Sequence, residues 1–316
     1  MKDIYDVIII GAGPAGLAAG IYAGRYRLST LILEKSAYGG QAVLTSEIEN
    51  YPGVFNEGPV GGQELTDRMR AQAAHFGAEF ETAKIVSAEL DGAVKKLKAE
   101  DGREFSARTV IIAGGAHYRP IGCKNEERFV GCGISYCATC DANFFAGLDV
   151  YVAGGGESAL EEAMYLARVA RRVYIVHRRD RFRASAYTVE RASRIDNISF
   201  IMDSVVEEAD GEDVLDTIRI RNLKTGELSV ITADEEDGML GLFGFVGMEP
   251  ETGIYEAAGI ELRDGYINAG EDTHTNKDGV YAAGDIRIKS LRQIVTAAAD
   301  GAVAAFEAER YLSSIG

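Results

Sequence analysis

Tryptophan is absent from the 316 residues of this chain, and cysteine and proline are scarce, with four and five residues. Four cysteines are too few to form the disulfide framework of a secreted protein of this length. Basic residues are also in deficit, with 33 against 49 acidic ones, which leaves a net charge of −16. Because such a surface repels phosphate groups, we expect no binding to nucleic acid or to a membrane.

Uninterrupted hydrophobic segments are missing as well. Residues 7–24 carry no charge over 18 positions, but five glycines and Pro14 interrupt them. A membrane helix needs about 20 apolar residues, so this pattern predicts a strand, a loop and a helix instead. The N-terminus, which reads Met-Lys-Asp, shows neither the basic nor the apolar stretch of a targeting signal. We therefore expect a cytoplasmic protein.

Glycine, in contrast, is abundant at 37 residues, and it marks a pattern that occurs twice. In the first copy, a β-branched run at residues 7–10 precedes a glycine-rich loop, a helix up to Arg25 and a buried strand at residues 30–34. The second copy starts 143 residues later, with a strand at 150–153, a helix through Ala170 and a strand at 173–176. The loop residues are Gly11, Gly13, Ala15 and Gly16 in the first copy and Gly154, Gly156, Glu157, Ser158 and Ala159 in the second.

Both loops stand between a strand and a helix, which is the context that a dinucleotide-binding motif requires. The first glycine forms the turn, the second lets the backbone approach a pyrophosphate, and the third, or an alanine, allows the helix to pack on the sheet. Free N–H groups at the helix N-terminus attract the anion. The alternative is a purely structural turn, but two copies in this context predict two nucleotide-binding domains.

The rest of the chain predicts mainly strands and turns. Residues 80–112 and 198–231 alternate like antiparallel strands, with turns at Asp91-Gly92, Asp101-Gly102 and near Thr225. After Asp237, glycine recurs at every third position, which predicts a flexible crossing between domains. These glycines are Gly238, Gly241, Gly244 and Gly247.

The residues at the end of the second strand in each copy predict which nucleotide is bound. Glu34 ends the strand of the first copy, where a carboxylate accepts hydrogen bonds from ribose hydroxyls and repels a 2′-phosphate. This favours FAD, with NAD as the alternative. The second copy instead carries a basic cluster, which favours NADPH because guanidinium groups bind phosphate; a solvated basic loop is the alternative. The cluster consists of His177, Arg178, Arg179, Arg181 and Arg183.

Cys137 and Cys140 form a Cys-x-x-Cys motif that Asp141 follows. No second cysteine pair and no histidine pair completes a zinc site, so we predict no metal. A redox dithiol is the better interpretation, since this spacing lets two thiols close a disulfide, although a buried structural pair is the alternative. Asp141 is a candidate proton donor or acceptor for thiolate chemistry.

Taken together, these motifs resemble the low-molecular-weight, bacterial-type thioredoxin reductases of the pyridine nucleotide-disulfide oxidoreductase family over the whole chain. Their order and spacing make the resemblance specific. The matching motifs are residues 11–16, Gly39-Gly40-Gln41, residues 50–53, residues 137–141, residues 154–159, His177-Arg178-Arg179 with Arg183, Gly284-Asp285 and Arg292-Gln293.

The resemblance implies an α/β fold of two Rossmann-like, three-layer ββα domains. The FAD domain comprises residues 1–115 and 247–316, and the NADPH domain is inserted at 116–246. It also implies that one group of residues binds the flavin: Glu34, Gly40, Gln41, Asn50, Gly284, Asp285, Arg292, Gln293 and Ile294.

By the same resemblance, the cysteines have distinct roles. Cys140 is the flavin-proximal thiol, Cys137 attacks the partner disulfide, and Asp141 protonates the departing thiolate. The implied enzyme is a homodimer that passes electrons from NADPH through FAD to thioredoxin.

Two departures from the family pattern stand out. Gly114 replaces the usual threonine, and Cys123 and Cys132 are additional thiols. The alternatives to a thioredoxin reductase are a flavin-dependent dithiol oxidase, a reductase of another thioredoxin-fold partner and a nucleotide-binding module without turnover. The arginine cluster argues against the oxidase, and the Cys-x-x-Cys motif argues against the module.

Overall fold

The computed structural model describes residues 2–45, 48, 50–54, 58 and 60–315. The chain divides into two compact units. Unit 1 consists of Met1–His117 and Glu249–Gly316, and unit 2 of Tyr118–Met248. Among the described residues, no helix has the length and apolar character needed to cross a bilayer.

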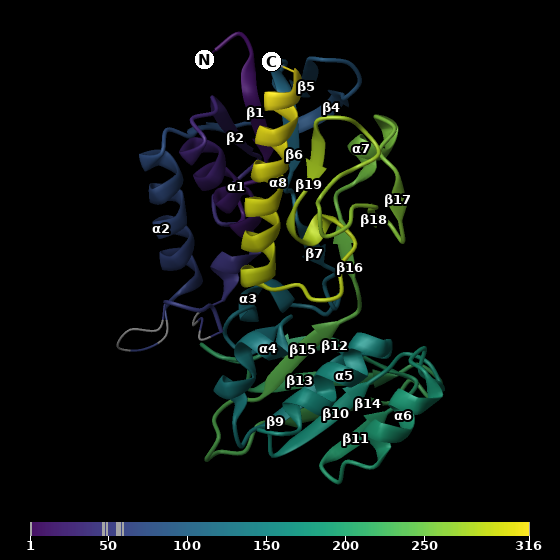
Figure 1. Cartoon of the computed structure of the whole chain (residues 1–316). Helices are drawn as coiled ribbons and strands as arrows, with labels where there is room; N and C mark the ends of the chain where they lie inside the picture. Colours follow the sequence, from purple (N-terminus) through teal and green to yellow (C-terminus); the bar gives the residue numbers. More distant parts are fainter. Residues whose placement is uncertain (1, 46–47, 49, 55–57, 59, 316) are drawn as a thin grey trace. The chain divides into compact units, whose positions relative to one another are not determined.

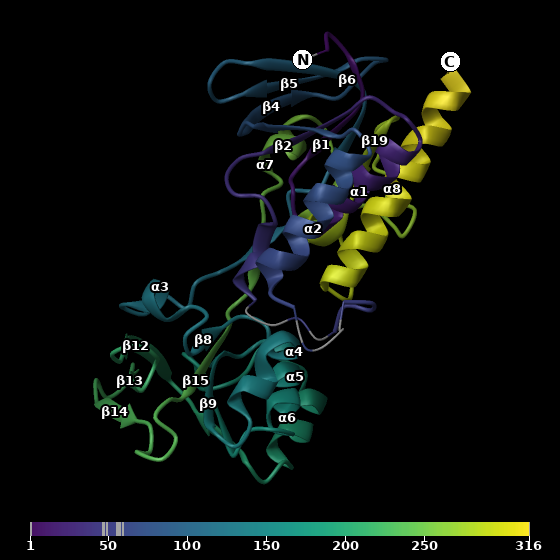
Figure 2. The same cartoon turned by 90° about the vertical axis from the view of Figure 1, so that its left-hand side faces the viewer.

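Unit 1 is built on a seven-stranded sheet in the order β3-β2-β1-β6-β5-β4, with β19 paired to β6 (Figures 1 and 2). Strands β1, β2, β3, β6 and β19 run parallel, and β4, β5 and β6 form an antiparallel meander. The strands of this sheet are β1 (Tyr5–Ile10), β2 (Thr30–Glu34), β3 (Glu79–Thr82), β4 (Ile85–Glu89), β5 (Lys95–Ala99), β6 (Glu104–Ile112) and β19 (Val280–Ala282). Outside it, β17 (Leu262–Arg263) and β18 (Tyr266–Ile267) form an antiparallel pair.

Alternating side chains give this sheet two buried faces. On β1, Val7 and Ile9 face a core that α1 and α8 complete, whereas Ile8 and Ile10 face a second core. Helices α1, α2 and α8 lie side by side in both views (Figures 1 and 2). The helices of unit 1 are α1 (Pro14–Arg25), η1 (Gly40–Leu44), α2 (Gly62–His75), α7 (Gly253–Ala257), η3 (Gly284–Ile286) and α8 (Ile294–Ile315).

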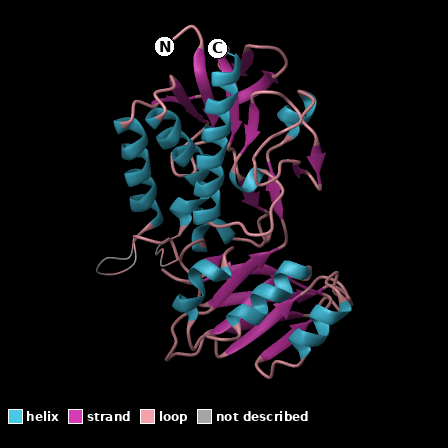
Figure 3. Ribbon diagram, in the orientation of Figure 1, coloured by secondary structure: helices cyan, strands magenta, loops and turns pink. Residues whose placement is uncertain are grey.

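Unit 2 has three layers. Its parallel sheet has the order β11-β10-β9-β15-β8; one face packs on α5, and the other on an antiparallel sheet of β12, β13 and β14 (Figure 3). The elements are α3 (Glu126–Phe129), β8 (Ile134–Ser135), α4 (Ala138–Asp141), η2 (Ala142–Phe145), β9 (Asp149–Gly154), α5 (Glu157–Leu166), β10 (Arg172–Val176), α6 (Ala186–Ser193), β11 (Ile198–Ile201), β12 (Ser204–Asp210), β13 (Thr217–Asn222), β14 (Leu228–Thr232) and β15 (Gly241–Phe245).

The predicted α/β fold class with two Rossmann-like units is confirmed. The segments that link the two units pair as β7 (Ala116–Tyr118) and β16 (Met248–Pro250). The domain boundaries at 115/116 and 246/247 stay a prediction.

Three local expectations are wrong. The strands β3 and β11 pair in parallel with their neighbours, although alternation predicted antiparallel strands. The helix α5 ends at Leu166 rather than at Ala170.

The third concerns the glycines after Asp237. Gly241 and Gly244 lie in β15, a buried strand paired on both sides, and not in a flexible crossing. A Cβ on Gly241 would meet the Phe145 ring at 2.7 Å, and one on Gly244 would meet Tyr136 at 2.4 Å. These glycines therefore serve close packing rather than flexibility.

Candidate functional site

The first glycine loop joins β1 to α1 and leaves no room for side chains at two positions. Gly11 has a φ of +107°, and a Cβ there would lie 2.3 Å from the Ala113 carbonyl oxygen. A Cβ on Gly16 would lie 1.9 Å from the Gly11 oxygen. Gly13 precedes α1, whose first turn has neither a side-chain cap nor an acidic residue. The N–H groups at this helix end therefore suit an anion.

Glu34 is buried at the end of β2, where its carboxylate organises the loop. Its Oε2 accepts a hydrogen bond from the Ala12 N–H at 2.8 Å, and its Oε1 accepts one from the Ser36 N–H at 3.1 Å. The backbone of Gly39 also donates to the Ala12 oxygen, at 2.9 Å. Oε1 also lies 3.5 Å from the Ser36 hydroxyl, whereas Oε2 keeps a second lone pair, which a ribose hydroxyl can use.

Two of the remaining predicted flavin residues, Gly40 and Gly284, border this loop through contacts within unit 1. A Cβ on Gly40, which precedes Gln41 in η1, would lie 3.1 Å from the Gly13 Cα. A Cβ on Gly284 would lie 2.8 Å from the Ala15 Cβ. The structure therefore brings the Gly40 and Gly284 segments to the glycine loop.

Beside Gly284, Asp285 and Arg292 carry polar atoms that no described residue satisfies. Asp285 Oδ1 and Arg292 Nε are buried without a hydrogen-bond partner among the described residues. Burial raises the pKa of Asp285, and the charges of Lys289 and Arg292 offset part of that effect. Asn50 Nδ2 donates to Gln293 Oε1 at 3.1 Å, next to Ile294 at the start of α8. Unpaired buried polar atoms are costly, so these two fit the polar groups of a bound ligand.

The Gly284 turn is held in place by a buried ion cluster. Asp300 Oδ2 accepts hydrogen bonds from the Gly284 N–H at 2.9 Å, from Arg287 Nε at 2.8 Å and from Lys289 Nζ at 2.9 Å. Burial acts to raise the pKa of Asp300, but the hydrogen bonds and charges of Arg287 and Lys289 lower it below its usual range. The sequence alone did not single out this cluster, because nothing in the residue pattern shows that Asp300 of α8 pairs with Arg287 and Lys289.

The second glycine loop, between β9 and α5, is equally crowded. A Cβ on Gly154 would lie 2.6 Å from the Ala159 Cβ, and one on Gly155 would lie 2.1 Å from His177 Nδ1. Gly156 is the N-cap residue of α5 and provides no side-chain cap, and Glu157 is an acidic residue in the first turn. Ser158 is exposed in the first turn.

Glu157, predicted to contact the cofactor, has other partners in unit 2. Its carboxylate accepts hydrogen bonds from the Ser185 N–H at 2.8 Å and from the Thr188 hydroxyl. It thereby ties the first turn of α5 to the start of α6. Its contact with a nucleotide stays a prediction.

The basic cluster after β10 lies around an open pocket of about 440 Å³. Arg179 and Arg183 line the pocket, as do Asp180, Arg181, Phe182, Asp203 and Lys224, whereas Arg178 is exposed and does not line it. The Arg183 N–H donates to the Gly155 oxygen at 2.8 Å, so the pocket adjoins the second glycine loop. Lys224, from the β13–β14 turn, forms an ion pair of 3.0 Å with Asp203, and sequence reasoning missed it.

His177 supports this cluster rather than lining the pocket. Its ring is buried, stacks on Phe182 with centroids 5.3 Å apart, and places Nε2 3.1 Å from the Arg181 oxygen. Burial lowers the pKa of His177. The imidazole therefore braces the loop that carries the arginines.

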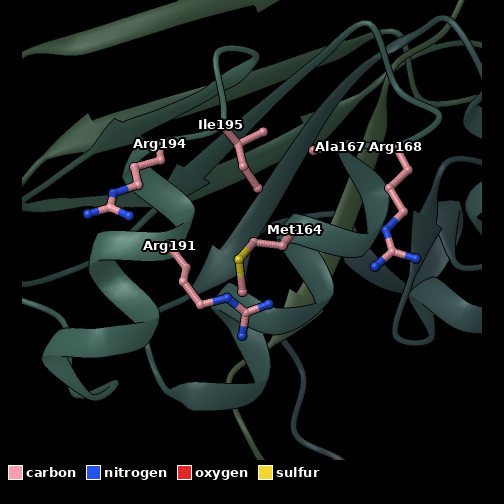
Figure 4. A pocket seen from close by; sticks show the side chains of 6 residues that line it. All are labelled: Met164, Ala167, Arg168, Arg191, Arg194 and Ile195. Carbon is pink, nitrogen blue, oxygen red and sulfur yellow. The ribbon is translucent and has the colours of Figure 1, made fainter.

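A further pocket of about 340 Å³ lies between the ends of α5 and α6. Its arginines splay apart: Arg194 and Arg168 point to opposite sides, and Arg191 extends along Met164 (Figure 4). These guanidinium groups therefore do not converge on one point in the groove.

The Cys-x-x-Cys motif lies at the start of α4 and forms a disulfide between Cys137 and Cys140. Asp141 follows, with Oδ2 accepting a hydrogen bond from the Ser135 hydroxyl at 2.6 Å. Asp141 Oδ1 is buried without a described partner. Burial raises the pKa of Asp141, and the Ser135 hydrogen bond partly counteracts it. A carboxyl group that holds its proton more strongly than usual thus lies beside a reducible disulfide.

The two additional cysteines take no part in this disulfide. Cys123 is buried, and burial, with a contribution from the Glu126 charge, raises the pKa of its thiol to about 12. Cys132 is exposed. Within the described part of the chain, no group of three or more His, Cys, Asp or Glu side chains is arranged to hold a metal.

Comparison with known proteins shows the family of this chain. The pyridine nucleotide-disulphide oxidoreductase profile matches residues 5–301. The thioredoxin reductase of Peptoclostridium acidaminophilum is 47% identical over 315 residues, covering 99% of both chains. That of Bacillus subtilis is 42% identical over 99% of this chain and 96% of its own.

A solved structure agrees with these relatives. The crystal structure of thioredoxin reductase from Streptococcus pyogenes superposes with a TM-score of 0.91 at 42% identity, covering 99% of this chain and all of that one. The resemblance inferred from the sequence motifs is confirmed. The chain belongs to the thioredoxin reductases of the pyridine nucleotide-disulphide oxidoreductase family.

Proposed function

We propose that this chain is an NADPH-dependent flavoprotein that reduces the disulfide of thioredoxin through its Cys137–Cys140 pair. The observation that carries the proposal is this disulfide beside the buried, unpaired Asp141 Oδ1, in a chain with two separate nucleotide-binding loops. Family membership supports the reaction class.

FAD is assigned to unit 1. The open N-terminus of α1 would hold the pyrophosphate, and Glu34 would accept from the ribose. Asp285 Oδ1 and Arg292 Nε fit the polar atoms of the ribityl chain or the flavin ring. We propose the same environment for Gly40, Gln41, Asn50, Gln293 and Ile294.

NADPH is assigned to unit 2. The N-terminus of α5 would hold the pyrophosphate, and Arg179 and Arg183 would bind the 2′-phosphate in the neighbouring pocket. When bound, NADPH supplies two electrons as hydride and FAD delivers them to the disulfide.

Disulfide exchange by the chain's own residues follows from these assignments. The Cys137 thiolate attacks one sulfur of the partner disulfide, so a mixed disulfide forms and the partner's second sulfur departs as a thiolate. Asp141 gives that thiolate a proton. The Cys140 thiolate then attacks the Cys137 sulfur, which restores the Cys137–Cys140 disulfide and releases the partner's other sulfur.

The exchange balances in electrons and in protons. Two electrons pass to the partner, and the two protons that it takes up equal the two that the Cys137 and Cys140 thiols release. Asp141 regains its proton from these thiols.

We further propose that the partner is thioredoxin or a thioredoxin-like protein, and that the enzyme is a cytoplasmic homodimer. A dithiol oxidase is the second candidate, but it has no need of the basic pocket at Arg179 and Arg183. A reductase of another thioredoxin-fold protein would share every residue named here. Kinetic comparison of several such proteins separates these two reductases.

The test uses Cys137→Ser and Cys140→Ser variants of the holoprotein. Both are expected to keep the visible absorbance of bound flavin and to lose NADPH-driven reduction of thioredoxin. The matched control is Cys132→Ser, at an exposed cysteine outside the disulfide, which should keep the wild-type rate. Thioredoxin turnover in both site variants would overturn the proposal.

A further inference from the structure

Ser135 links both ends of the redox motif. It is the last residue of β8, is 6% exposed, and lies beside Phe243 of β15 in the parallel sheet. Its Oγ lies 2.6 Å from Asp141 Oδ2 and accepts the Cys137 N–H at 3.1 Å. The hydroxyl is therefore held by a sheet strand between Asp141 and the backbone of Cys137.

We propose that Ser135 is a positioning residue that occupies Asp141 Oδ2, so that the transferable proton resides on Oδ1. This inference rests on the proposed role of Asp141 as the acid of disulfide exchange. It adds a residue outside the Cys-x-x-Cys-Asp motif to the machinery of the reaction.

The hydrogen-bonding capacity of a hydroxyl group supports this location of the proton. A serine has one hydrogen to donate, and two acceptors lie near Ser135: Asp141 Oδ2 at 2.6 Å and the Cys137 oxygen at 3.4 Å. The shorter contact is the stronger bond, so the hydrogen points to Oδ2. A proton on Oδ2 would turn the serine hydrogen towards the distant Cys137 oxygen, which is a weaker arrangement.

Oδ1 is the better donor also because nothing competes for its proton. It is buried and has no partner among the described residues. Burial raises the pKa of Asp141 and the Ser135 hydrogen bond lowers it, and no charged side chain among the described residues contributes. Because the Ser135 bond favours the carboxylate, its removal should raise the pKa of Asp141 further.

The experiment compares holoenzymes carrying Ser135→Ala, Ser135→Thr and Asp141→Asn, and the double variant Ser135→Ala/Asp141→Asn. Ser204→Ala is the matched control, since Ser204 is a buried serine of the same unit whose hydroxyl donates to the Met202 oxygen at 2.8 Å. Two quantities are measured. The first is the rate at which thioredoxin reoxidises the pre-reduced enzyme, as a function of pH. The second is the pH titration of the Asp141 carboxyl group, followed by infrared spectroscopy as the band that disappears in Asp141→Asn.

Ser135→Ala should slow reoxidation about tenfold, a part of the roughly 100- to 10,000-fold that general acid–base catalysis contributes. It should also move the Asp141 titration and the matching limb of the rate profile to higher pH. Ser135→Thr should restore both, the double variant should be no slower than Asp141→Asn, and Ser204→Ala should behave as wild type.

The outcomes separate the inference from the proposed function on which it rests. If Asp141→Asn slows the reaction but Ser135→Ala changes neither rate nor titration, the positioning role is wrong and the acid remains. A further loss in the double variant would also overturn the inference, because Ser135 would then act apart from Asp141. If Asp141→Asn is reoxidised at the wild-type rate, the proposed role of Asp141 as the acid is wrong.

Discussion

Cofactor choice should depend on two guanidinium groups of unit 2. Arg179 and Arg183 line the open pocket beside the second glycine loop, and neither side chain has an ion pair with a described acidic residue. The perturbation is the double variant Arg179→Ala/Arg183→Ala. It leaves the loop in place, because the bond from Arg183 to Gly155 comes from the backbone N–H.

The expected magnitude follows from the number and exposure of these groups. A hydrogen bond to a charged group contributes roughly 1.5–3 kcal/mol. Since both arginines are exposed, we take the lower end, which gives about 3 kcal/mol for two bonds. That is about a hundredfold loss of affinity. Asp180 and Asp203, which remain in the pocket, would add repulsion towards the 2′-phosphate.

The assay is kcat/KM for NADPH and for NADH with saturating thioredoxin. The variant should lose about two orders of magnitude with NADPH and little with NADH, which lacks the phosphate. Arg178→Ala is the matched control, because this exposed neighbour does not line the pocket. An unchanged ratio of the two cofactors in the double variant, or an equal loss in Arg178→Ala, would refute the assignment of the phosphate to this pocket.

Three further predictions concern unit 1. Asp300→Asn should lower the free energy of unfolding in urea by about 3–5 kcal/mol, because it leaves the buried charge of Lys289 without a described counter-ion and leaves Arg287 paired only with the exposed Glu271 at 3.3 Å. Arg287 and Lys289 hold the pKa of Asp300 below its usual range, so the wild type should lose this stability as pH falls through that lowered pKa. Asp300→Asn should not show this acid-dependent loss. Identical stability profiles of wild type and Asp300→Asn at acid pH would contradict this prediction. Gly11→Ala should abolish flavin absorbance, since its Cβ would meet a backbone oxygen at 2.3 Å, whereas Gly92→Ala, with no atom within 4 Å, should keep it.

The parts of the site that form within one stretch of chain could be predicted from the sequence. The two glycine loops and the Cys-x-x-Cys-Asp motif fall into this class, because a turn, a helix N-terminus and a short disulfide each need only neighbouring residues. The position of Glu34 beside the first loop could be predicted for the same reason, since this residue ends the next strand along the chain.

Contacts from distant segments could not be predicted; Lys224, for example, reaches the Arg179 pocket from the β13–β14 turn. Ser135 is close to the motif in sequence, but no residue pattern reveals that its hydroxyl donates to Asp141. The glycines of β15 were misread for a related reason. Gly241 and Gly244 are small because Phe145 and Tyr136 pack against them, and no local pattern reveals that packing.

The most direct test of the account is an anaerobic titration of the purified protein followed by its visible absorbance. NADPH should bleach the flavin, and oxidised thioredoxin added afterwards should restore it in the wild type but not in Cys137→Ser. Failure of NADPH to bleach the flavin, or equal recovery in Cys137→Ser, would contradict the claim that electrons reach the partner through the Cys137–Cys140 disulfide.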